Sequence, residues 1–163
     1  MSYSPITVAK LFTLFANADG GKMLTHMQLQ KLTYIAHGYK LATTQGQQPL
    51  ISDDVNAWKF GPVIPSLYQE LKSYGNGKVI PLFFTSNDLP ISPNDQALIK
   101  AIYDAYGNKD GVELSDLTHR QGTPWDQVWH GANGRHYHGA VIPDSLICQY
   151  YTEFLRCGQA AGL

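Results

Sequence analysis

The chain has 163 residues, close to the common size of one domain, and its 44% hydrophobic and 15% charged residues argue against a disordered chain. The formal net charge of −1, without any basic run, disfavours nucleic acid as a partner, since phosphate binding needs clustered Lys and Arg. No stretch approaches the roughly 20 apolar residues that span a membrane, and the first residues lack a secretory signal, so we expect one cytoplasmic domain over residues 1–163.

The first predicted helix opens at Ser4 and Pro5. Serine is a preferred N-cap residue, and proline suits the first helical position because its missing amide hydrogen has no partner there. Apolar side chains then recur at helical spacing on one face, and the run at residues 17–21, which contains two glycines, should end the helix. That face consists of Val8, Leu11, Phe12 and Phe15.

The second predicted helix has the best-marked start. Thr25 and Gln28 have the spacing of a capping box, while Leu24 and Leu29 have the spacing of a hydrophobic staple. We expect one apolar stripe to face the core and the helix to end at Gly46. The stripe consists of Leu29, Leu32, Ala36 and Tyr39.

The middle of the chain predicts short strands around another helix. Residues 55–60 alternate between apolar and polar side chains, which favours a short extended segment before a Gly-Pro pair. The next helix should start at Pro65 and end at Gly75. Residues 78–84 are predicted to form a second short strand, which Pro81 confines to a sheet edge because it lacks an amide hydrogen.

Four further helices are predicted after residue 90. The first covers residues 92–107 and begins with a Ser-Pro cap, and a short one follows over residues 112–120. Residues 123–126 repeat the pattern of cap, proline and acidic residue for a brief helix. After a polar loop, the last helix runs over residues 143–158. The sequence therefore predicts a mainly α fold with a minor β element.

The two cysteines, Cys148 and Cys157, both fall on the last predicted helix. At about 1.5 Å of rise per residue, they are too far apart for a disulfide bond. We therefore expect two buried free thiols.

Familiar catalytic motifs are absent: the sequence has no glycine-rich phosphate loop, G-x-S-x-G, H-E-x-x-H or C-x-x-C. We accordingly expect no enzyme and no cofactor. The strongest catalytic alternative is a metal-dependent hydrolase built on the loop that contains His130, Arg135, His136 and His138. Its spacing matches no standard zinc pattern, so we predict no metal and interpret it as a polar loop.

Three aromatic residues and two prolines surround the junction between the extended segment and the following helix. They are as typical of core packing as of a binding surface. A rigid docking surface is the functional alternative, because proline restricts the backbone and Trp and Tyr often dominate protein interfaces. The candidate partner-binding residues are Trp58, Phe60, Pro62, Pro65 and Tyr68, and the loop with His130, Arg135, His136 and His138 is the second candidate.

One family pattern extends through this junction. Residues 29–38 read LQKLTYIAHG, residues 49–50 read PL, and residues 57–68 read AWKFGPVIPSLY. Together they resemble the signature of the SocA-like antitoxin family, the Panacea domain, whose members occur in bacteria and their phages. The resemblance implies an antitoxin that neutralises a cognate toxin protein by direct binding. A phage or prophage regulator or inhibitor that binds another host protein or DNA is the alternative, and the oligomeric state stays open.

Overall fold

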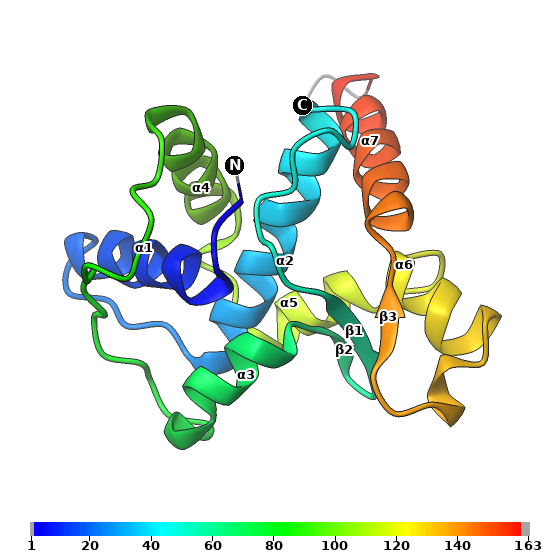
Figure 1. The fold of residues 1–163 in the computed structure, drawn as a ribbon, viewed down its shortest axis with the longest axis horizontal. Helices are drawn as coiled ribbons and strands as arrows, with labels where there is room; N and C mark the ends of the chain where they lie inside the picture. The colour runs from blue at the N-terminus through cyan, green and yellow to red at the C-terminus, as the bar shows by residue number, and fades with distance from the viewer. Residues whose placement is uncertain (1, 161–163) are drawn as a thin grey trace.

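Helix α2 (His26–Thr43) lies at the centre of the fold (Figure 1). The computed structural model describes residues 2–160, with the side chains of residues 2–158. Helices α1 (Pro5–Ala18) and α4 (Pro93–Tyr106) pack on one side of α2, and α7 (Asp144–Ala160) packs on the other. A small antiparallel sheet lies near the start of α7 (Figure 1). The predicted mainly α fold with a minor β element is confirmed.

The surroundings of α2 differ from the prediction of a single apolar stripe. Residues 28–38 are all buried, so the helix is covered on every side by its neighbours. The closest approach is at Gly38, where an added Cβ would lie 2.3 Å from the ring of Tyr151 on α7. The helix also ends earlier than predicted, at Thr43. The prediction of one stripe was wrong because periodicity identifies apolar positions but not the number of elements that pack around them.

The predicted start of α2 is confirmed. The Thr25 hydroxyl accepts a hydrogen bond from the Gln28 amide at 3.2 Å, and the Gln28 side-chain oxygen accepts one from the Thr25 amide at 2.8 Å. Both predicted staple residues, Leu24 and Leu29, are fully buried. A complete capping box therefore fixes the first turn of the central helix.

We expect Thr25→Ala to lower the free energy of unfolding by about 1 kcal/mol, because the Gln28 amide loses its acceptor. Denaturant unfolding followed by circular dichroism would measure the loss. Thr43→Ala is the matched control, since it removes an exposed hydroxyl at the other end of the same helix. Its effect should stay within about 0.5 kcal/mol. Equal stability of the two variants would contradict the role of the cap.

The sheet has the strand order β2-β1-β3. The predicted extended segment is confirmed as β1 (Val55–Trp58), and the next two residues form the turn to β2 (Gly61–Val63). Strand β2 was not predicted because it contains Pro62, but it lies at the sheet edge, where a missing amide hydrogen is tolerated. Strand β3 (Ala140–Ile142) is too short to show an alternating pattern.

The strand predicted over residues 78–84 is wrong. Its only pairing among the described residues is an isolated bridge between Lys78 and Thr25. Ile80 and Phe83 are exposed, at 58% and 69%. Because no strand in residues 2–160 runs beside it, this apolar segment crosses the surface without regular structure.

The remaining helices follow their predicted starts closely. The hydroxyls of Ser92 and Thr123 both accept the expected hydrogen bonds, whereas the hydroxyl of Ser4 makes no capping bond and lies 3.0 Å from that of Thr7. Helix α7 continues through Gly158, so the predicted end there is wrong. The other elements are α3 (Pro65–Leu71) with η1 (Lys72–Tyr74), α5 (Gly111–Thr118), α6 (Pro124–Asp126), η2 (Gln127–Gly131) and η3 (Gly134–His136).

Both cysteines are free, but the prediction that both are buried was wrong. Cys148 is partly buried and Cys157 is exposed. Helix α7 packs against α2 along one face only, and Cys157 points away from that face.

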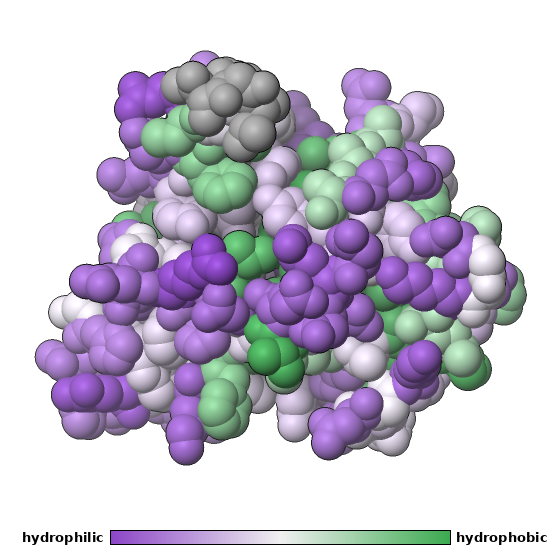
Figure 2. Space-filling view, turned by 180° about the vertical axis from the view of Figure 1, so that it is seen from behind, coloured by the Kyte–Doolittle hydropathy of each residue, from purple (hydrophilic) through white to green (hydrophobic). Residues whose placement is uncertain are grey.

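Buried side chains from the helices and the sheet form a hydrophobic core around α2. That residues 1–163 constitute one domain stays a prediction. No helix among the described residues has the length and apolar character needed to cross a membrane. On the face opposite to that of Figure 1, hydrophobic side chains emerge in separate patches among hydrophilic ones (Figure 2).

Candidate functional site

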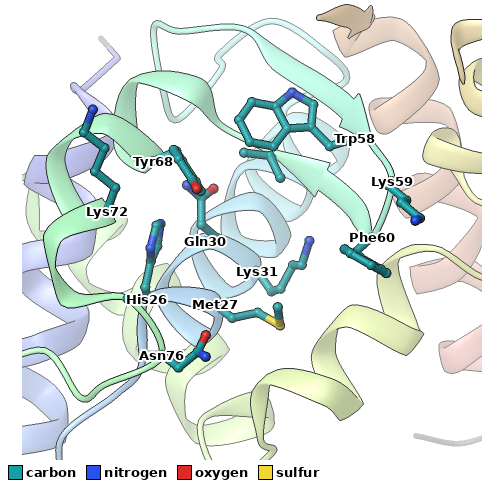
Figure 3. Close-up of a pocket in the computed structure, with 12 residues that line it drawn as sticks. His26, Met27, Gln30, Lys31, Trp58, Lys59, Phe60, Tyr68, Lys72 and Asn76 are labelled. Atoms are coloured by element: carbon teal, nitrogen blue, oxygen red, sulfur yellow. The ribbon is translucent and has the colours of Figure 1, made fainter. Parts of the chain in front are cut away.

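A pocket of about 360 Å³ opens between the start of α2, the β1–β2 turn and the α3–η1 segment (Figure 3). We call it the aromatic pocket. Helix α2 contributes its floor, the turn contributes one wall, and α3 with η1 contributes the other. The side chains used below are His26, Met27, Gln30 and Lys31 from α2, Trp58, Lys59 and Phe60 from β1 and the turn, and Tyr68 and Lys72 from the opposite wall.

Three of the five predicted binding residues meet at this pocket. The rings of Trp58 and Tyr68 lie edge to face with their centroids 5.1 Å apart. Phe60, at the tip of the turn, is 65% exposed, and Tyr68 is 37% exposed. The two prolines do not line the pocket: Pro62 is buried in β2, and Pro65 lies in a different depression. The structure thus places the aromatic residues together and the prolines behind them.

Side chains from beneath hold the turn in place. The Gln30 amide group makes two hydrogen bonds with the backbone of Ile64, donating to its carbonyl at 3.1 Å and accepting from its amide at 2.9 Å. The Ser115 hydroxyl donates to the Phe60 carbonyl at 2.8 Å, and the Trp125 indole donates to the last carbonyl of β1 at 2.5 Å. Because α5 bonds the turn itself, while α6 and α2 bond the backbone just before and after the β1–β2 hairpin, the turn presents Phe60 on a rigid support.

Lys31 is a lysine in the protein interior. Only 3% of the residue is exposed, and its ammonium donates to the Pro62 carbonyl at 2.7 Å. Burial lowers the pKa of Lys31 to about 7. Gly61, with φ of +120°, leaves room for it, since a Cβ there would lie 2.9 Å from Nζ. Lys31 was not predicted as a site residue, because it lies outside the predicted apolar stripe and its burial depends on the elements that pack around α2.

His26 is the second buried basic group at the pocket. His26 is 7% exposed, and its ring nitrogen Nε2 has no hydrogen-bond partner among the described residues. Its ring lies 5.1 Å from that of Tyr68, toward which it points in Figure 3. Burial lowers the pKa of His26, so the neutral ring is favoured.

The second predicted site, the histidine loop, is divided in the structure. His130 lies beside Asp126, with Nδ1 2.7 Å from a carboxylate oxygen. Arg135, His136 and His138 instead line a shallow depression of about 400 Å³ on the far side of β1. Within residues 2–158, no three His, Cys, Asp or Glu side chains are grouped so that they could hold a metal ion. The metal-dependent hydrolase therefore has no ligand set in this part of the chain.

Comparison with known proteins identifies the family. The model for "Antitoxin SocA-like, Panacea domain" matches residues 29–126, which is more than half of the chain. The chain belongs to this family. Its Panacea domain match covers the floor and both walls of the aromatic pocket except the first turn of α2. The resemblance predicted from the sequence is thus confirmed.

A curated relative extends the comparison beyond the Panacea domain match. Antitoxin SocA from Caulobacter vibrioides is 29% identical over 133 residues, which are 76% of this chain and 70% of the relative. No solved structure matches the chain.

Proposed function

We propose that this protein is a cytoplasmic antitoxin without enzymatic activity that neutralises a cognate toxin protein by binding it, and that the toxin docks at the aromatic pocket. Family membership and the similarity to Antitoxin SocA support the antitoxin role. The exposed Phe60, which lies on a turn held from three helices, is the observation that supports this location.

The physical argument concerns the cost of ordering. A protein interface loses affinity when side chains and loops must be immobilised on binding. Here the backbone of Phe60 in the turn is bonded to Ser115, that of Trp58 before it to Trp125, and that of Ile64 after β2 to Gln30, so little further ordering is needed. Aromatic side chains at the centre of an interface also contribute more than most other types. The pocket combines both properties.

Phe60→Ala and Tyr68→Ala should each abolish rescue of cells that express the cognate toxin. The first candidate for this toxin is the product of a small toxic gene beside this one. Removing a central aromatic residue often costs about 2 kcal/mol, which corresponds to roughly 30-fold weaker binding. Calorimetric titration with the purified toxin would measure that loss. Because both side chains are exposed, thermal unfolding should hardly change.

Phe83→Ala is the matched control, since Phe83 is as exposed as Phe60 but does not line the pocket. It should retain rescue. Full rescue by folded Phe60→Ala and Tyr68→Ala proteins, or loss of rescue in Phe83→Ala alone, would move the interface away from the pocket.

A further inference from the structure

We infer that the aromatic pocket binds an acidic side chain of its protein partner, with the carboxylate at Lys31 and an adjoining apolar side chain against the aromatic rim. That the partner is the toxin rests on the proposed function. The binding chemistry itself rests on the charges, burial and hydrogen bonds of the pocket.

Basic side chains are concentrated at the pocket. Lys31, Lys59, Lys72 and His26 line the pocket, and none of the lining residues is acidic. The whole chain, in contrast, has a formal net charge of −1. The positive charge of the pocket is therefore a local feature, and it complements an anion rather than a cation or a neutral group.

The buried basic groups of the pocket are incompletely hydrogen-bonded. An ammonium group can donate three hydrogen bonds, but Lys31 makes one among the described residues, to the Pro62 carbonyl. The buried Nε2 of His26 makes none among the described residues. Buried polar groups in proteins are normally paired, because an unpaired one loses its bonds to water without compensation. A carboxylate that enters the pocket could accept a further hydrogen bond from Lys31, and the unpaired His26 ring lines the same pocket.

Apolar and aromatic side chains surround Lys31 in the pocket. In Figure 3, Lys31 projects from α2 into the space between Met27 and Phe60, while Trp58 and Tyr68 form the other side. A short acidic side chain reaching Lys31 must pass this apolar rim. The pocket thus fits a carboxylate that is flanked by an apolar or aromatic residue better than a lone inorganic anion.

The inference has a pH dependence with a defined sign. A carboxylate binds the protonated form of Lys31 best, so affinity should be highest below about pH 7 and should fall as the pH rises through the pKa of Lys31, about 7. Protonation of His26 acts in the same direction. The other titratable side chains that line the pocket are His26, Lys59, Tyr68 and Lys72, and His119 at the end of α5 lies beside Gly61, so no acidic group among them opposes this dependence.

The test uses two probes that differ only in charge, N-acetyl-Phe-Glu-amide and N-acetyl-Phe-Gln-amide. Each is titrated into the isotope-labelled full chain and followed by NMR, which detects weak binding. At about pH 6 the Glu probe should bind about tenfold more tightly than the Gln probe, as expected for one charge-assisted hydrogen bond, and should shift the signals of Lys31 and Phe60. At about pH 9 the two affinities should converge.

Lys31→Met should bind both probes equally. Lys22→Met is the matched control, because the Lys22 ammonium also donates to a backbone carbonyl, that of Gly107 at 2.5 Å, but does not line the pocket. It should keep the preference. If Lys31→Met does not fold, the pH profile of the parent protein decides alone.

Equal affinity of the parent for both probes at every pH would overturn the inference, and so would tighter binding of inorganic phosphate at the same residues. Its failure is distinguishable from failure of the proposed function. No preference for Glu, combined with loss of toxin rescue in Phe60→Ala, refutes the inference alone. A preference for Glu, combined with full rescue by the pocket variants, refutes the toxin site alone.

Discussion

Replacing Leu32 with alanine is expected to lower the free energy of unfolding by about 2 to 5 kcal/mol. Leu32 is fully buried on α2, which is surrounded by α1, α4, α5 and α7. Removing its side chain leaves a cavity that four packed helices cannot close completely, so the lost contacts add to the lost burial. Denaturant unfolding of the purified protein would measure the effect.

Leu29→Ala should lose stability in the same range, because Leu29 is equally buried. Leu89→Ala is the matched control, since Leu89 is 50% exposed on a surface loop. Its change should stay within about 0.5 kcal/mol. A denaturation midpoint of Leu32→Ala equal to that of the parent would mean that α2 is not the packed centre of the fold.

Asp95→Ala is expected to cost about 3 kcal/mol or more, because it removes one partner of a buried ion pair. The Asp95 carboxylate accepts hydrogen bonds from the Lys40 ammonium at 2.5 Å and from the Tyr3 hydroxyl at 2.8 Å. The side chains of Asp95 and Lys40 are only 7% and 13% exposed. Without the carboxylate, an ammonium and a hydroxyl lose their acceptor in a place that water hardly reaches.

Asp104→Ala on the same helix is the control, because Asp104 pairs with Lys100 where both side chains are about half exposed. Such a pair contributes less than about 1 kcal/mol. Burial opposes ionisation of Asp95, but the bonds from Lys40 and Tyr3 outweigh it and lower the pKa of Asp95. Its stabilisation is therefore present above about pH 4, the ordinary Asp range, and is lost as the pH falls through the lowered pKa. The difference between parent and Asp95→Ala should shrink accordingly in acid, and a constant difference would contradict the ion pair.

Helix starts were predictable because their signals are local. The cap residues Thr25, Ser92 and Thr123 bond to amides three positions away, so the sequence contains both partners within one turn. Strands β2 and β3 were not predictable in the same way, because each depends on pairing with β1. Strand β3 in addition lies about 80 residues further along the chain than β1. The complete burial of α2 likewise depends on α7, which packs against it from the end of the sequence.

The candidate site was predictable in its aromatic part and not in its basic part. Trp58, Phe60 and Tyr68 are grouped within a short stretch, so their proximity follows from the sequence. Lys31 and His26 reach the same pocket from α2, and only the folded chain shows that the turn covers this part of the helix. The candidate prolines were assigned to the surface because they stiffen the turn, but the structure places Pro62 inside the sheet.

The rigid support of the aromatic pocket has an evolutionary consequence. Floor residues such as Gln30 and Lys31 bond to the backbone of the β2 region, so changing them risks the fold as well as the binding site. Rim residues such as Lys59, Phe60 and Lys72 are exposed, and their replacement is nearly neutral for stability. Mutations can therefore accumulate at the rim at little cost, and a new partner can be acquired there without rebuilding the scaffold that presents it.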